Sequence, residues 1–192
     1  DICTRSCGFC AIKTGKPEIL DEDEPERVAT AIAYLDLRHA VITSVNRDEL
    51  PDGGAKIFAR TIEAVHRQCP NTTIEVLIPD FKGDWTALGT VMAAAPDILN
   101  HNIESPPRLY YKMRPQAQYE RSLELLDRAR KLSPAPTKSG MMLGAGETEE
   151  EIATSIRDLA DVGCSILTLG QYLSPSAQHV QVERFVHPDE FI

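Results

Sequence analysis

Short apolar runs alternate with amphipathic segments along this chain, and that alternation limits the folds open to it. The runs have the length and composition of buried strands and lie at residues 40–45, 73–78, 97–103, 138–143 and 165–170. Apolar residues recur at helical spacing between them, most clearly over 53–66, 119–132 and 148–163. Repeated strand-then-helix units are typical of a parallel sheet covered by helices.

Capping residues support the same division. Asp84 is placed to cap one helix, and Thr148 with Glu151 has the spacing of a capping box at the start of another. With a strand before Cys3, the chain contains six βα units. We therefore predict an α/β fold, a partial parallel (β/α)6 TIM-like barrel with a truncated first strand. We expect one domain over residues 1–192, incomplete at both ends.

Functional groups in such folds lie on the loops after the carboxyl ends of the strands. Thr43 and Ser44 lie at the carboxyl end of the first apolar run. Asn102 and Glu104 end the third run at period two, so they share one face. Later runs are followed by further polar residues, Glu147, Gln171 and Tyr172. We expect these groups to face one site.

Three cysteines lie within eight residues, with the spacing Cys3-x3-Cys7-x2-Cys10. Three thiolates bind three of the four irons of a [4Fe–4S] cluster and leave the fourth iron with an open coordination position. An open position on a metal centre is where a ligand binds and reacts. The spacing therefore indicates a redox cofactor.

Other interpretations of the cysteines fit less well. A zinc site usually has four ligands in two short pairs, and the remaining cysteines, Cys69 and Cys164, are isolated. The histidines have no paired spacing. A disulfide framework favours an even number of cysteines in a short secreted chain, and this chain has five. We interpret Cys69 and Cys164 as core thiols.

The composition excludes some classes of function. The formal net charge is −9 and no basic cluster is present, which argues against a nucleic-acid surface. No run of eighteen apolar residues occurs, so we expect no membrane span. The chain starts inside the cysteine motif without a methionine, and we expect both ends to be cut.

The cysteine spacing, with Phe9 just before the last thiol, resembles that of the radical S-adenosylmethionine (SAM) superfamily. Further strings narrow the resemblance to the lipoyl synthases, and they follow in the right order over nearly all 192 residues. They lie at 43–50, 52–54, 79–81, 100–104, 114–115, 137–140, 144–148 and 169–176. The cysteines alone would identify only the superfamily.

The resemblance implies a reaction and its cofactors. Cys3, Cys7 and Cys10 hold a [4Fe–4S] cluster, SAM chelates the open iron, and an electron cleaves SAM to methionine and a 5′-deoxyadenosyl radical. That radical removes hydrogens from C6 and C8 of an octanoyl chain, and sulfur from a second, auxiliary [4Fe–4S] cluster is inserted at each carbon. The octanoyl group is carried on a lysine of a lipoyl carrier domain or a glycine-cleavage H protein.

The resemblance also implies partners and a location. We expect a monomer whose electron donor is a ferredoxin or flavodoxin. We expect it in the bacterial cytoplasm, or in a mitochondrion or plastid if the source is eukaryotic, because a thiolate cluster suits a reducing compartment.

Expected SAM contacts follow from the chemistry of its groups. Glu104 and Asn102 suit the ribose or the ammonium group, and Arg114 or Lys138 suits the carboxylate. Glycines let the backbone approach the flat adenine closely. The other expected contacts are Thr43, Ser44, Gly144, Gly146, Glu147, Gln171, Tyr172 and Leu173. Alternatively, the two glycines only serve the turn before the capping box at Thr148.

The chain also departs from the family. Lipoyl synthases carry an upstream Cys-x4-Cys-x5-Cys motif for the auxiliary cluster and a closing Arg-Ser-Ser segment, and these 192 residues contain neither. We therefore predict that the chain binds one cluster and SAM but makes no lipoyl product. Two rival functions are a sulfur-inserting radical SAM enzyme of the biotin synthase kind and a non-catalytic metal-binding module loaded with zinc.

Overall fold

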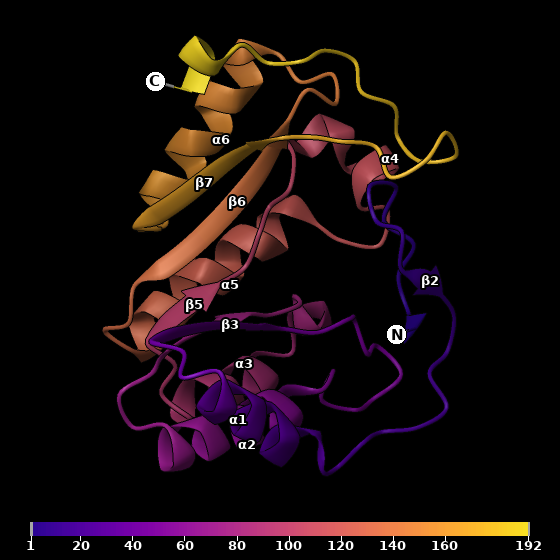
Figure 1. Cartoon of the computed structure of the whole chain (residues 1–192). Helices are drawn as coiled ribbons and strands as arrows, with labels where there is room; N and C mark the ends of the chain where they lie inside the picture. The colour runs from indigo at the N-terminus through magenta and orange to yellow at the C-terminus, as the bar shows by residue number, and fades with distance from the viewer. Residues whose placement is uncertain (1, 192) are drawn as a thin grey trace.

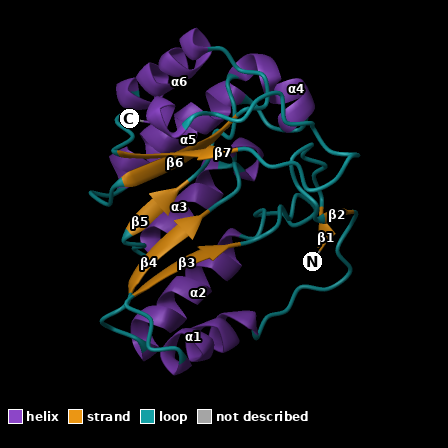
Figure 2. Cartoon of the chain, turned by 45° about the horizontal axis from the view of Figure 1, so that its top comes forward, coloured by secondary structure: helices purple, strands orange, loops and turns teal. Residues whose placement is uncertain are grey.

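The computed structural model describes residues 2–191, so residues 1 and 192 of the expected domain lie outside the described part. Its centre is a parallel sheet whose five strands neighbour one another in chain order (Figure 1). The strands are β3 (His39–Thr43), β4 (Thr73–Leu77), β5 (Ile98–Asn100), β6 (Thr137–Leu143) and β7 (Ile166–Gln171). Figure 2 shows them as a twisted arc, which confirms the predicted partial barrel.

Helices connect the strands and cover the outer face of the arc (Figure 2). They are α1 (Glu24–Tyr34), α2 (Ala55–Gln68), α3 (Trp85–Ala93), α4 (Tyr110–Met113), α5 (Tyr119–Leu132) and α6 (Glu149–Asp161). Three 3-10 turns add η1 (Phe81–Gly83), η2 (Pro107–Leu109) and η3 (Pro188–Phe191). Both predicted caps are confirmed. The Asp84 side chain accepts from two backbone N–H groups of α3, and Thr148 with Glu151 makes both bonds of the capping box.

The core lies between the strands and these helices. Ile74 and Val76 alternate along β4 and are fully buried against α2 and α3. Met141 and Leu143 do the same on β6, where they pack with Leu159 of α6. Because side chains alternate between the two faces of a strand, Glu75 of β4 and Lys138 of β6 lie on the opposite face of the arc. The carboxyl ends of these strands are where the sequence predicts the functional groups.

Two predicted strands differ from those observed. The third run ends as a strand at Asn100 instead of residue 103, because the N–H of Ile103 turns to the side-chain oxygen of Ser139. Glu104 then takes a left-handed conformation, with φ 64°, and pairs only locally with β6. The expected first strand is present as β1 (Ile2–Cys3), but it pairs with β2 (Lys13–Thr14) in a separate small sheet.

An irregular segment, residues 172–187, follows β7 and is here called the C-terminal strap. It runs from the end of the sheet past α4 to the loop near the N-terminus and then returns (Figure 1). The N–H of Val180 donates to the carbonyl of Gly8, and the N–H of Glu183 donates to the carbonyl of Gly144. The strap therefore joins the ends of β6 and β7 to the segment that carries the three cysteines. None of the helices in residues 2–191 has the length and apolarity needed to cross a membrane.

Candidate functional site

The three cysteines lie on one short loop, residues 3–10, here called the cysteine loop. Cys3 is buried at the end of β1, and Cys7 and Cys10 are partly buried. The sulfur of Cys3 accepts backbone N–H groups from Arg5 at 3.4 Å and Asn46 at 3.3 Å. The N–H of Cys10 donates to the carbonyl of Cys7 over 3.1 Å, which closes a turn. The hydrogen bonds from Arg5 and Asn46 fix the place of the Cys3 sulfur.

The second half of the cysteine loop is held from the opposite side. The N–H of Gly8 donates to the carbonyl of Met113 in α4, and its carbonyl accepts from Val180, both at 2.9 Å. A side chain at Gly8 would overlap the carbonyl of Lys112, so this close approach requires glycine. The ring Nε2 of His179 lies 3.2 Å from the carbonyl of Cys10.

Burial controls the protonation of one thiol. It raises the pKa of Cys7 to about 11, and the guanidinium groups of Arg114 and Arg5 oppose this only partly. Cys7 is therefore a neutral thiol near pH 7 until a metal binds. A metal ligand must be deprotonated, so binding there releases a proton.

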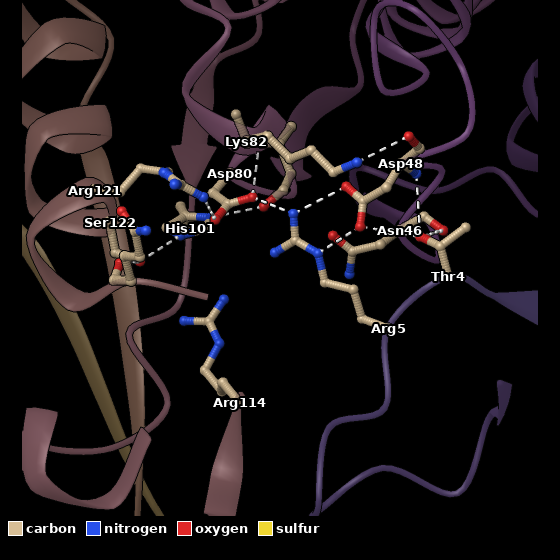
Figure 3. Close-up of polar contacts among 12 residues, drawn as sticks. Thr4, Arg5, Asn46, Asp48, Asp80, Lys82, His101, Arg114, Arg121 and Ser122 are labelled. Atoms are coloured by element: carbon tan, nitrogen blue, oxygen red, sulfur yellow. Dashed lines mark hydrogen bonds and ion pairs between the residues drawn. The ribbon is translucent and has the colours of Figure 1, made fainter. Parts of the chain in front are cut away.

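A buried ionic network anchors the first half of the cysteine loop (Figure 3). Arg5 donates from Nε and Nη2 to the two oxygens of Asp48, over 2.7 and 2.9 Å, and from Nη2 to Asp80 over 2.5 Å. Arg121 of α5 contacts the other oxygen of Asp80 at 3.2 Å. Burial opposes the charged form of Asp80, but the bonds from Arg5 outweigh it and lower the pKa of Asp80 to about 2. Sequence reasoning missed this network because its members are far apart along the chain.

A cavity of about 890 Å³ opens beside the thiols. Its polar lining includes Thr43 and Ser44, so the structure brings these predicted residues next to the cysteine loop. Its other lining residues include Cys3, Cys7, Cys10, Asn46, Val28, Ile42 and Phe58. The Asn46 oxygen Oδ1 is buried and has no hydrogen-bond partner in the described part of the chain. Asn46 lies three residues past Thr43 in the same post-strand string, and that position is the signal that could have found it.

Asn102, Glu104 and Arg114 form a second polar group after β5. Nη1 of Arg114 donates to the backbone carbonyl of Asn102 over 2.7 Å and lies 3.4 Å from the hydroxyl of Tyr110. Burial raises the pKa of Glu104, against the attraction of Arg114. The side-chain oxygen of Asn102 is buried and has no partner among residues 2–191. An unpaired buried acceptor beside a half-buried carboxylate suits a donor-bearing ligand.

Lys138 is placed differently from the other predicted residues. It lies at the start of β6, so the parallel strand carries it away from the loops at the carboxyl edge. Its ammonium group contacts both carboxylate oxygens of Glu75, at 3.0 and 3.1 Å. Asn100 also donates to Glu75, over 2.8 Å. In the structure, Lys138 therefore forms an ion pair with Glu75 inside the barrel.

The glycine loop after β6 is shaped by protein contacts. Gly144 and Gly146 have φ values of 101° and 105°, which favour glycine. The buried carboxylate of Glu147 accepts the N–H of Gly144 at 2.5 Å and of Ala145 at 3.0 Å. A side chain at Gly144 would overlap the carbonyl of Arg184 in the strap. The alternative interpretation of these glycines as turn residues therefore has direct structural support.

The predicted residues after β7 hold the strap. Gln171 donates to the carbonyl of Tyr172 over 2.8 Å and accepts the N–H of Val186 over 2.8 Å. Tyr172 is buried, and its hydroxyl donates to the carbonyl of Val180 over 2.6 Å. Leu173 is 66% exposed. Tyr172 belongs to an apolar cluster against which Phe9 of the cysteine loop packs, and it also reaches that loop through Val180.

The donor set suits an iron–sulfur cluster. Within residues 2–191, no group of three His, Cys, Asp or Glu side chains is close enough to hold one metal ion. A cluster does not need such a group, because each thiolate binds a different iron. Three thiols on a single anchored loop, beside a cavity with an unpaired acceptor, provide three corners and room for a further ligand.

Comparison with known proteins places the chain in a family. The family model of the Radical SAM superfamily matches residues 1–159. The chain belongs to the radical SAM superfamily. Members of this family bind a [4Fe–4S] cluster and SAM, which agrees with the cysteine loop and its cavity. The family therefore implies cofactors for which the three thiols and the adjoining cavity offer room.

Curated relatives narrow the family. The lipoyl synthase of Roseiflexus sp. (strain RS-1) is 59% identical over 192 residues, which are 100% of this chain and 64% of that protein. The lipoyl synthase of Caldanaerobacter subterraneus subsp. tengcongensis is 53% identical over the whole chain, which covers 67% of it. Within the radical SAM superfamily, the chain therefore belongs to the lipoyl synthases. It spans less than two thirds of the length of the Roseiflexus relative.

Solved structures share the fold. SuiB of Streptococcus suis, bound to S-adenosylmethionine, matches with a TM-score of 0.75 at 9% identity, over 96% of this chain and 41% of that one. Methylornithine synthase (PylB) matches with a TM-score of 0.71 at 14% identity, over 96% of this chain and 54% of that one. At these identities the likeness shows the radical SAM fold alone.

Proposed function

We propose that this chain supplies the radical-generating core of a lipoyl synthase, which inserts two sulfur atoms at C6 and C8 of a protein-bound octanoyl-lysine. The observation that carries the proposal is the anchored triad of Cys3, Cys7 and Cys10 beside a cavity of about 890 Å³. Identity of 53–59% to lipoyl synthases over the whole chain supports the same reaction. A [4Fe–4S] cluster held by these thiols supplies the electron for the cleavage of SAM.

The residues around the cavity are proposed to bind the polar end of SAM. The unpaired Oδ1 of Asn46 is an acceptor for the ammonium group, and the Thr43 and Ser44 hydroxyls line the same space. Both hydroxyls now donate to backbone carbonyls, so each keeps acceptor capacity for a ligand. Burial of an unpaired acceptor is costly, and a ligand donor removes that cost.

The group after β5 is proposed to bind the remaining polar groups of SAM. Asn102 and Glu104 present acceptors for the ribose hydroxyls. Arg114 suits the carboxylate, because its guanidinium has donors beyond those that reach Asn102 and Tyr110. The ion pair of Lys138 with Glu75 favours Arg114 over Lys138 in this role. Leu173 is exposed, and its backbone is proposed to meet the adenine.

The substrate and the partners belong to the same proposal. We infer an octanoylated lipoyl carrier domain or glycine-cleavage H protein as substrate, and a ferredoxin or flavodoxin as electron donor. Apart from the triad, these 192 residues contain only Cys69 and Cys164, which are too few to ligate an auxiliary cluster by thiolates alone. By itself the chain therefore binds one cluster and SAM but forms no lipoyl product.

Anaerobic reconstitution tests this proposal. We expect about four irons per chain, because a cubane cluster carries four. With a chemical reductant, the chain should release methionine from SAM, and an octanoyl-lysyl peptide should accelerate that release while dethiobiotin should not. Acceleration by dethiobiotin instead would favour the biotin synthase kind. Binding of zinc in place of iron would indicate a non-catalytic metal module. About eight irons per chain would overturn the prediction of a single cluster.

A further inference from the structure

We propose that Arg5 is a positioning residue that fixes the Cys3 side of the cysteine loop in the geometry that accepts the cluster. Arg5 lies between two of the thiols in sequence and is only 4% exposed, and the hydrogen bonds of its guanidinium within residues 2–191 go to residues outside the loop. The guanidinium instead reaches Asp48 and Asp80 (Figure 3). The inference rests on the proposed function, in which Cys3, Cys7 and Cys10 are the cluster ligands. It adds a role for Arg5 that the spacing of the cysteines does not predict.

The two carboxylates make Arg5 a bridge between the loop and the sheet. Asp48 follows β3 and Asp80 follows β4, so both lie at the carboxyl edge of neighbouring strands. Asp80 is completely buried and is itself fixed by Arg121 and by the N–H of Lys82. A guanidinium that binds such a carboxylate is held in both position and orientation.

Hydrogen bonds of residues next to Arg5 connect this anchored segment to the sulfur of Cys3. The Thr4 hydroxyl bonds to Asp48, and its N–H donates to the carbonyl of Asn46, each over 3.1 Å. The N–H groups of Asn46 and Arg5 are the donors to the Cys3 sulfur, at 3.3 and 3.4 Å. Moving Arg5 therefore shifts the backbone N–H groups that set the place of this sulfur.

The loop segment with the other two thiols is held by different contacts. The effect of Arg5 on the position of Cys3 can therefore be distinguished from an effect on the stability of the whole fold. Gly8 bonds to Met113 and Val180, and Cys10 bonds to His179. These contacts do not include Arg5. Loss of Arg5 is therefore expected to free the Cys3 side of the loop while the Cys10 side stays in place. The spacing of the three thiols would change without unfolding of the barrel.

The test uses the 192-residue chain with Arg5→Gln, Arg5→Lys and the matched control Arg121→Gln. Arg121 contacts the same Asp80 from α5, so its loss removes one cation beside Asp80 while the bridge from Arg5 stays. In the metal-free chain, alkylation followed by mass spectrometry should show Cys3 reacting about tenfold faster in Arg5→Gln, because its segment opens locally. Alkylation of Cys10 should change less than about twofold.

Reconstitution gives the second measurement. Iron should fall from about four per chain to fewer than about two in Arg5→Gln, and stay at about four in Arg121→Gln. Arg5→Lys keeps the charge but not the planar fork, so we expect an intermediate iron content and an altered electron paramagnetic resonance spectrum of the reduced cluster. Circular dichroism checks that each variant is folded, and if Arg5→Gln is not, Arg5→Lys decides.

Several results would overturn the inference. Full iron and unchanged Cys3 alkylation in Arg5→Gln or Arg5→Lys would show that the bridge does not position the loop. An equal loss of iron in Arg121→Gln would assign the effect to the charge of Asp80. If the unaltered chain bound no iron, the proposed function would fail, while the alkylation of Cys3 in the metal-free chain would still test Arg5.

Discussion

The hydroxyl of Tyr172 donates to the carbonyl oxygen of Val180 over 2.6 Å, and both residues belong to the C-terminal strap. The N–H of the same Val180 donates to Gly8 in the cysteine loop over 2.9 Å. The N–H of Tyr172 bonds to the end of β6, at the carbonyl of Leu143. Tyr172 and Val180 of the strap thus connect the sheet to the cysteine loop.

Tyr172→Phe removes this hydrogen bond and keeps the aromatic ring. We expect the free energy of unfolding to fall by about 1 kcal/mol, the net contribution of a typical hydrogen bond, because the Val180 carbonyl loses a partner. Urea denaturation measures the change. Tyr111→Phe is the control, because Tyr111 is 75% exposed and should leave stability unaltered. A loss in the Tyr111 variant as large as that in Tyr172→Phe would contradict the prediction.

Two glycines should respond to alanine in opposite directions. Gly144→Ala places a methyl group against the Arg184 carbonyl at a φ of 101°, so we expect a loss of about 2–4 kcal/mol. Gly89→Ala meets no atom within 4 Å inside α3 and should add about 0.5–1 kcal/mol, because alanine favours a helix. Thermal unfolding of both variants checks the signs. A stabilised Gly144→Ala would show that the strap does not press on this loop.

His101 should make stability depend on pH. It is completely buried, with one ring nitrogen 2.8 Å from the Ile78 carbonyl and the other 3.0 Å from the Ser122 hydroxyl. Burial lowers the pKa of His101 from 6.5 to about 4. Between these values the unfolded chain binds a proton that the folded chain does not, so stability falls as pH decreases. The full loss approaches about 3 kcal/mol below pH 4.

Denaturation curves between pH 7 and pH 4 measure this dependence. His101→Gln should unfold more easily at pH 7 and show a flatter profile across the window. His187→Gln serves as the control, because this exposed histidine should leave the profile of the unaltered chain in place. Equal slopes for the His101 variant and the unaltered chain would rule out His101 as the cause.

Substitutions of Cys7 and Cys164 should affect the bound iron very differently. Cys7→Ser removes one corner of the proposed cluster site, so iron after reconstitution should drop below about one per chain. Cys164→Ser should keep about four irons, because Cys164 packs in the core beside β6. Iron and sulfide determinations compare the two variants under identical conditions. Full iron in Cys7→Ser, or none in Cys164→Ser, would show that the ligands are misassigned.

Local sequence signals located most elements of the fold. The apolar spacing over 119–132 gave the observed bounds of α5, and Thr148 begins α6 with the predicted capping box. Both depend on residues within one or two helical turns. The end of β5 could not be predicted in this way, because it depends on a bond between Ile103 and Ser139, a residue of another strand.

In the candidate site, too, local patterns predict some residues, while other contacts depend on residues far apart in the chain. The three thiols and the neighbouring hydroxyls of Thr43 and Ser44 follow from spacing and from the parallel sheet, which brings strand ends together. The partners of Arg5 lie 43 and 75 positions away, and no local pattern announces them. Nor does any pattern near Gly144 show that the strap will pass over it.

The contact between His179 and Cys10 spans 169 positions of the chain, and this sets an order for biosynthesis. During translation, the Cys3 side of the cysteine loop has its carboxylate partners once Asp80 has left the ribosome. The Cys10 side waits for another hundred residues. Because domains fold as the chain emerges, the Cys10 side of the loop gains this contact only after residue 179 has been synthesised.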